Sequence, residues 1–422
     1  MKMSLGHITS SVVINALRFT LALVFAFSGF VKAIDPMGTV YKMADYADAF
    51  GMSVGHGWLF GGAMLLIMAE YLMGMCLFFG LYRRTYLTLI IAFLLVMTPL
   101  TLYSALYNPV SDCGCFGDAV VLTNWQTFGK NVVLLLMAII VLLGRRYMWR
   151  VISERTQWLV FVYVGASVMA FILYNLRHLP VVDFRPYHVG ANIIESMSVP
   201  EGAPQDEYET LFVLEKDGEQ RTFTLDNYPD STWTFVERHN RLIQKGYVPP
   251  ITDFQLTDRQ GEDCTWEVLE HPGYTFLMVA YDLKRTDEGM LDVINDLYDY
   301  ADMHNVPFYM LTSSGNEDIE EWNDHTGAIY PFLLADEVQL KTMVRDTPGL
   351  ILLKDATVVG KWSRRDMPHD ELLVESMESN AAWQMMSARQ QRRRVNVVLW
   401  MFVPLMLLVG VDKCMKKNVT NQ

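Results

Sequence analysis

The sequence lacks the residue patterns that mark most soluble enzymes. It has no glycine-rich phosphate-binding loop and no serine nucleophile elbow. Its nine histidines are scattered without the spacing of metal ligands, so no metal site is expected. Basic residues are scarce in the segment 183–388, which holds 15 of the 34 lysines and arginines but 39 of the 47 acidic residues. This acidic segment argues against nucleic acid as a partner.

Long apolar runs are what the chain has in excess. The hydrophobic fraction is 51%, which is high for a soluble protein, and it is concentrated before residue 180 and near the end of the chain. Six runs approach the ~20 residues that are needed to cross a bilayer. They span residues 12–31, 58–81, 86–106, 125–143, 158–176 and 395–411. We therefore expect a multi-pass helical bundle surrounded by membrane lipid.

Basic residues in short loops and tails predict the orientation of these spans. They gather before the first span, at Arg83 and Arg84, between 145 and 155, and after residue 412. All lie on one side if both termini are cytoplasmic. We expect a protein of the bacterial cytoplasmic (inner) membrane, with the acidic segment on the periplasmic side. The arginines at 389–394 depart from this pattern, but charge beside a long translocated domain has little influence on orientation.

Two charged residues, Arg18 and Glu70, lie inside the first two predicted spans. An unpaired charge at the centre of a membrane helix costs about 2.5–3.5 kcal/mol on insertion scales. We therefore expect an interhelical ion pair between Arg18 and Glu70. Such a pair either fixes the packing of the two helices or belongs to a functional polar pocket.

The chain has five cysteines, of which Cys113 and Cys115 flank a single glycine in the predicted outer loop between the third and fourth spans. Two cysteines so spaced can close a small strained disulfide, and strained disulfides tend to be oxidising. The flanking carboxylates of Asp112 and Asp118 are expected to raise a thiol pKa, which disfavours a reactive thiolate. Three interpretations stay open: a redox-active pair, a structural loop disulfide, or a metal-binding pair, although two thiols are too few ligands for zinc.

The first 145 residues resemble DoxX-like membrane proteins and the related MauE proteins. The likeness rests on Arg18, on Ser-Gly-Phe-Val-Lys at 28–32 with Asp-Pro at 35–36, and on Cys-Gly-Cys-Phe-Gly at 113–117. It implies a four-helix membrane unit over 1–145; the apolar runs further along the chain add a fifth span (157–177) and a C-terminal span (395–411). It also implies a role in handling disulfides or in maturing a partner outside the membrane. It does not imply methylamine metabolism, because likeness of fold does not transfer substrate.

The acidic segment is expected to contain two parts outside the cytoplasm. Residues 183–248 read as a small β-rich lead-in with a hairpin at 211–225. Residues 249–385 begin with a second hairpin at 253–261, and buried strands then alternate with helices in the order βαβ followed by αββ. This order resembles an α/β thioredoxin fold of the TlpA or peroxiredoxin type. Pro348 lies where that fold places its cis-proline.

The acidic segment departs from that family at the redox site. Residues 281–287 follow the first buried strand, where active relatives carry their cysteines, and contain none. The one thiol of the segment, Cys264, is isolated, and we expect it to be unpaired and partly buried rather than bonded to Cys113 or Cys115. The domain is therefore expected to bind a protein or peptide partner or to shield the membrane site.

Two functions fit the whole sequence. The leading hypothesis is a membrane thiol-disulfide factor that acts through Cys113 and Cys115 and assists the maturation of an extracytoplasmic protein partner. The rival is a non-enzymatic membrane scaffold, whose cysteine loop is a structural disulfide and whose outer domain only binds. No cofactor motif is evident. A quinone electron acceptor in the bundle is compatible with the first hypothesis, but no residue demonstrates it.

Overall fold

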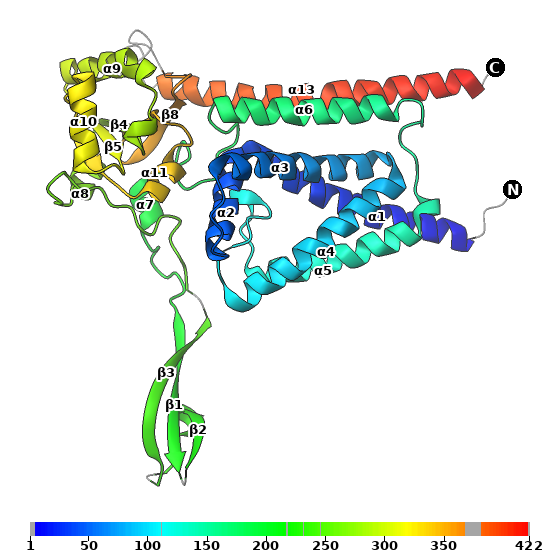
Figure 1. The fold of residues 1–422 in the computed structure, drawn as a ribbon, viewed down its shortest axis with the longest axis horizontal. Helices are drawn as coiled ribbons and strands as arrows, with labels where there is room; N and C mark the ends of the chain where they lie inside the picture. Colours follow the sequence, from blue (N-terminus) through cyan, green and yellow to red (C-terminus); the bar gives the residue numbers. More distant parts are fainter. Residues whose placement is uncertain are drawn as a thin grey trace.

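The computed structural model consists of a helical bundle and a region built on two β-sheets (Figure 1). It describes residues 5–110, 112–216, 218–230, 232–244, 246–367 and 381–420. Ser111, at the start of the cysteine loop, lies outside the described residues. So do residues 368–380, which belong to the predicted 249–385 domain.

Six helices in the described part of the chain are long and apolar enough to cross a membrane, which confirms the predicted multi-pass architecture. They are α1 (Leu5–Ile34), α3 (His56–Phe79), α4 (Arg83–Tyr107), α5 (Asn124–Leu143), α6 (Gln157–Arg177) and α13 (Ala381–Thr420). Each coincides with one of the six predicted apolar runs. The start of α1 and the end of α13 lie at the end of the bundle away from the sheets (Figure 1).

Helices α1 and α3 pack closely because glycines lie at their contact. A Cβ atom on Gly74 would lie 2.2 Å from the backbone nitrogen of Ala26, and one on Gly29 would lie 2.4 Å from that of Tyr71. Small residues of this kind let membrane helices approach until their backbones touch. The polar side chains of α1 and α3 are therefore held within direct hydrogen-bonding reach of each other.

A short helix that the sequence analysis did not predict, α2 (Pro36–Ala49), follows α1 directly. Asp35 caps it by accepting a hydrogen bond from the backbone N–H of Gly38 at 3.0 Å. Pro36 occupies the first helical turn, where its missing N–H costs nothing. Helix α2 is too short and too polar to span a bilayer.

The larger sheet has five strands in the order β6-β5-β4-β7-β8. Strands β4 (Tyr274–Val279), β5 (Phe308–Thr312) and β6 (Phe332–Leu334) are parallel to one another. Strands β7 (Gly349–Lys354) and β8 (Thr357–Ser363) form an antiparallel hairpin, and β7 also pairs antiparallel with β4. The peptide bond between Thr347 and Pro348, just before β7, is cis. The sheet thus contains the buried strands that the sequence predicts within residues 249–385.

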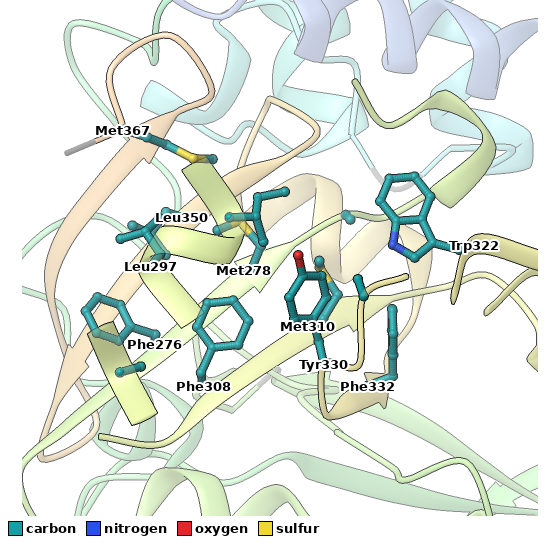
Figure 2. Packing of buried hydrophobic residues seen from close by; sticks show 14 of the residues in the cluster. Phe276, Met278, Leu297, Phe308, Met310, Trp322, Tyr330, Phe332, Leu350 and Met367 are labelled. Atoms are coloured by element: carbon teal, nitrogen blue, oxygen red, sulfur yellow. The ribbon is translucent and has the colours of Figure 1, made fainter. Parts of the chain in front are cut away.

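Helices cover both faces of this sheet. Helices α9 (Leu291–Met303) and α10 (Asn316–Thr326) pack on one face. Figure 2 shows the core beneath them, in which aromatic and methionine side chains from neighbouring strands interdigitate. The other face is covered by α7 (Ile193–Met197), α8 (Thr265–Leu269) and α11 (Glu337–Met343). Because both faces are buried, the strands read as continuous apolar runs rather than as alternating patterns.

The second sheet is a three-stranded arm that extends away from the rest of the molecule (Figure 1). Its strands are β1 (Glu207–Lys216), β2 (Glu219–Thr224) and β3 (Thr234–Gln244), in the order β2-β1-β3. The antiparallel pairing of β1 with β2 confirms the predicted hairpin. Strand β3 was not predicted, and every residue in it is exposed. Because neither face of β3 is buried, its sequence has no alternation of apolar and polar residues from which the strand could be predicted.

Two predictions about the acidic segment need correction. The stretch 183–248 is not one lead-in, because Tyr187 and Ile193 pack into the core on the α11 face of the larger sheet, while 207–244 forms the separate arm. The second predicted hairpin is reduced to an isolated bridge between Thr257 and Asp263. The side chain of Asp258 accepts backbone N–H bonds at 2.8 and 2.9 Å, which turns the chain before strand pairing can extend.

Candidate functional site

Cys113 and Cys115 lie in a tight turn between α4 and α5. The side chain of Asp112 accepts a hydrogen bond from the N–H of Gly114 at 2.9 Å and pairs with Lys42 of α2 at 2.7 Å. Gly114 has a φ of +64°, a conformation that side chains disfavour. A Cβ atom there would also lie 2.8 Å from Cγ of Lys42. The glycine between the cysteines is thus required by both the turn and the close approach of α2.

The two sulfur atoms lie 2.9 Å apart as free thiols. The hydrogen bond from Cys113, with Lys130 and Lys32 nearby, lowers the pKa of Cys115 to about 6 against the opposing effect of burial. The same hydrogen bond and burial raise the pKa of Cys113, although the neighbouring Tyr46 hydroxyl and Lys130 act in the opposite sense. The two pKa values are thus shifted in opposite directions, which favours Cys115 over Cys113 as the thiol that loses its proton first.

The lowered pKa of Cys115 differs from the expectation that the flanking carboxylates would raise a thiol pKa, whereas the raised pKa of Cys113 has the expected direction. Asp112 is occupied by Lys42 and the turn. Asp118 is half-exposed and faces Arg345. The charges that dominate at Cys115 are instead the lysines of α1 and α5, which are distant in sequence. Their positive charge favours the thiolate.

A buried polar cluster of Ser28, Lys32 and Glu70 lies directly beneath the cysteine turn. Nζ of Lys32 contacts both carboxylate oxygens of Glu70 at 2.6 and 2.7 Å. The Ser28 hydroxyl lies 2.7 Å from Glu70 and 2.6 Å from the backbone oxygen of Cys115, and donates to one of these acceptors. Ser28 and Lys32 share one face of α1 because they are four residues apart. The cluster ties α1 and α3 to the cysteine turn.

The predicted ion pair between Arg18 and Glu70 is wrong. Arg18 bonds instead to the side-chain oxygen of Asn15 at 3.0 Å and to the backbone oxygens of Trp149 and Phe78 at 2.6 and 2.7 Å. It thus satisfies the carbonyl of Phe78 at the C-terminal end of α3, where a cation is favoured. Fourteen residues of helix, about 21 Å, separate Arg18 from Lys32. Glu70 is level with Lys32 and out of reach of Arg18.

A cavity of about 690 Å³ opens beside the cysteine turn. Its lining includes Cys113, Cys115 and Lys32, together with charged residues of α2 and α11. The lining also includes apolar side chains, among them Phe50, Trp58, Leu66, Met97 and Leu100. The cavity therefore offers an apolar surface next to two thiols, within the usual size range of small-ligand sites.

Arg345 at the end of α11 joins the sheet region to the membrane part at this cavity. Its guanidinium contacts the carboxylate of Asp35 at 2.9 Å and lies over the ring of Tyr41 at 5.2 Å. Burial alone would raise the pKa of Asp35, but the charge and hydrogen bonds of Arg345 hold it below its usual range. Asp35 therefore both caps α2 and anchors the sheet region.

The structure separates the remaining predicted residues from this site. Cys264 lies before α8 and is unpaired and half-buried, with its sulfur 3.7 Å from the backbone oxygen of Glu262. Pro348 lies at the start of β7, outside the residues that line the cavity. Sequence reasoning missed the roles of Ser28, Lys32 and Arg345. The four-residue spacing in Ser-Gly-Phe-Val-Lys was the available signal for the first two, whereas no local pattern marks Arg345.

Residues 10–144 match the family model of the methylamine utilisation protein MauE. Residues 208–245, which form the three-stranded arm, match a domain of unknown function (DUF8463). No curated protein and no solved structure matches the chain. The MauE match covers α1 to α5, which carry the cysteines and the Ser28–Lys32–Glu70 cluster. The first third of this multi-pass membrane protein is therefore MauE-like.

Proposed function

We propose that the protein is a membrane thiol-disulfide exchange factor that assists the maturation of a protein partner outside the cytoplasm. The observation that carries the proposal is the pair of sulfurs 2.9 Å apart at the wall of a cavity, with the pKa of Cys115 lowered to about 6. A thiolate near neutral pH is the nucleophile of disulfide exchange. The MauE-like membrane part is consistent with an accessory role of this kind.

The proposed exchange uses the two cysteines in sequence. The Cys115 thiolate attacks a partner disulfide, so that a Cys115–partner disulfide forms and one partner thiolate leaves and takes up a proton. Cys113 then gives up its proton and attacks Cys115, which closes the Cys113–Cys115 disulfide and releases the second partner thiol. Two electrons have passed to the partner. After this sequence, repeated turnover needs a dithiol protein that reduces the Cys113–Cys115 disulfide again. The reverse sequence oxidises a partner dithiol, and repeated turnover then needs a quinone or another disulfide that oxidises the two thiols again.

The proposed orientation places the cysteine turn, the sheet region and the arm outside the cytoplasm, in the periplasm of a bacterium, with both termini cytoplasmic. Arginines at the opposite end of the bundle support it. The strand order of the larger sheet supports a thioredoxin-like assignment for this region. Because 281–287 contain no cysteine, we propose that the region recognises or positions the partner while the chemistry occurs at the membrane.

A second candidate function is a scaffold whose cysteines only stabilise the loop. One observation favours it: Cys113 is buried, as a structural cysteine usually is. The two functions differ in the reactivity that they require of Cys115. Exchange needs a thiolate that a disulfide can reach, whereas a structural pair does not.

A glutathione-trapping experiment separates the two functions. In the parent protein, Cys76, Cys264 and Cys414 are changed to Ser. Two single-cysteine proteins are made from it by adding Cys113→Ser or Cys115→Ser. Each purified full-length protein is incubated with oxidised glutathione at pH 7. We expect the protein that retains Cys115 to form a mixed disulfide. The protein that retains Cys113 should react at least about tenfold more slowly. Intact-protein mass spectrometry follows both reactions.

The parent protein, which retains both cysteines, is the control. It should release glutathione and close the Cys113–Cys115 disulfide, detected as a loss of two hydrogens without an adduct. Equal, slow reaction of the two single-cysteine proteins would reject the exchange function and leave the scaffold.

A further inference from the structure

A second cavity, of about 630 Å³, lies at the end of the bundle opposite to the cysteines. Its walls come from the end of α3, the start of α4, the end of α5 and the segment before α6. Five arginines line it: Arg83, Arg84, Arg145, Arg146 and Arg150. The lining includes one acidic residue, Glu154, which forms an ion pair with Arg150. The cavity therefore carries an excess of positive charge.

The start of α4 adds a second source of positive potential. The residue before it, Tyr82, has a φ of +37° and makes no capping hydrogen bond with its side chain. The first N–H groups of a helix have no partners within the helix, and together with the helix dipole they attract anions. Arg83, Arg84 and Thr85 belong to this first turn and line the cavity. An anion in the cavity would meet helix N–H groups and guanidinium groups together.

Local contacts hold two of these arginines in place without using up their donors. Arg83 donates to the backbone oxygen of Met148 at 2.9 Å. Arg146 lies over the ring of Tyr147 at 4.8 Å and donates to its hydroxyl at 2.8 Å. A guanidinium has five N–H donors, so both groups keep donors for another ligand. Their planar forks suit the oxygen atoms of a phosphate.

We propose that this cavity binds the phosphate of an anionic lipid headgroup. The ends of membrane-spanning helices lie at the level of the headgroups. Apolar groups border the arginines, since Leu143 is 76% exposed and Tyr82 is 41% exposed, and both can contact the acyl chains of the same lipid. Arginines that serve only to orient a protein in the membrane can lie anywhere in its cytoplasmic loops, but these five surround one cavity at the start of a helix. A basic pocket between helix ends is the form that headgroup sites take.

The test uses the purified full-length protein in neutral detergent with phosphatidylglycerol, phosphatidylcholine or inorganic phosphate added. We expect phosphatidylglycerol to raise the melting temperature and the other two to have little effect. In the double variant Arg84→Gln/Arg146→Gln, the phosphatidylglycerol concentration at half-effect should rise about tenfold or more. Arg83 is left unchanged because it bonds to the backbone.

The matched control is Lys413→Gln, which removes an exposed charge from the end of α13 without touching the cavity. It should keep the wild-type response. An equal response to phosphatidylcholine, an equal response to inorganic phosphate, or a full response in the double variant would overturn the proposal. If the double variant does not fold, native mass spectrometry of the wild type decides, because retained lipids must then be anionic rather than zwitterionic.

Discussion

At the scale of single residues, the chemistry of Cys115 depends on its neighbour in the turn and on groups from two helices. Cys113 supplies a hydrogen bond, Lys130 comes from α5, and Lys32 comes from α1. The lysines lower the pKa by charge and the neighbouring thiol lowers it by hydrogen bonding, while burial opposes both. The thiol pair itself could be predicted from the sequence because the two cysteines are two residues apart. Its charged surroundings could not, because the lysines approach it only after the helices pack.

The lowered pKa of Cys115 predicts a specific pH profile of alkylation. With Cys76, Cys264 and Cys414 changed to Ser, the iodoacetamide reaction rate at Cys115 should rise with pH and reach half its plateau near pH 6, because the thiolate is the reacting form. An ordinary thiol reaches this point at about pH 8.5. Peptide mass spectrometry after timed quenching gives the rate at each pH.

Two variants identify the cause of the shift. Cys113→Ala removes the hydrogen bond and Lys130→Gln removes a positive charge, so each should move the midpoint upward, with the larger change for Cys113→Ala. Arg365→Gln, an exposed position on the sheet region, should leave it unchanged. A midpoint near that of an ordinary thiol in the unmodified pair would contradict the assignment of Cys115 as the nucleophile.

At the scale of elements, the Lys32–Glu70 pair sets how α1 and α3 meet. Both side chains are nearly inaccessible, at 7% and 4% exposure. Breaking a buried pair by removing one partner typically costs about 3–5 kcal/mol, because the other charge is left uncompensated. Lys32→Met should therefore lower the melting temperature strongly, as followed by the intrinsic fluorescence of the protein in detergent.

The pair Lys341–Glu337, four residues apart on α11, provides the comparison, because its carboxylate is half-exposed. Glu337→Gln should cost less than about 0.5 kcal/mol, since a helical ion pair whose carboxylate is open to solvent contributes little. Removing both buried charges with Lys32→Met/Glu70→Met should recover part of the loss seen in Lys32→Met. A single variant as stable as the wild type would show that the pair is not structural.

Elements with the same kind of surroundings on all sides could be predicted from the sequence. The six spans and the buried strands of the larger sheet are apolar throughout, because lipid or helices surround them. Helix α2 and strand β3 were missed for the opposite reason. Helix α2 faces both the cysteine cavity and the sheet region, and β3 is exposed along its whole length, so neither has a simple apolar period.

At the scale of the whole molecule, the salt bridge between Asp35 and Arg345 connects residues 310 positions apart. Arg345→Gln should loosen the sheet region from the membrane part, because Arg345 is the cation that pairs with the carboxylate at the start of α2. Faster amide hydrogen exchange in both α2 and α11, measured by mass spectrometry, is the expected result. Arg365→Gln should leave exchange unchanged.

The pH dependence of this connection has a defined sign. The pKa of Asp35 is lowered in the folded protein, so the bridge contributes stability above the ordinary pKa of aspartate. That contribution is lost as the pH falls through the lowered value. Exchange in α2 should therefore stay slow at pH 5 in the wild type. Rapid exchange at pH 5 and pH 7 alike would mean that the bridge does not hold the two parts together.

The size of the cavity at the cysteines determines when a partner can react there. A space of about 690 Å³ accepts an object the size of a drug molecule rather than the face of a folded domain. A partner would have to insert a flexible segment that presents its cysteine on an unstructured loop or end. Thiol exchange at this site would thus occur early in the life of the partner, and completion of the partner's fold would itself end access.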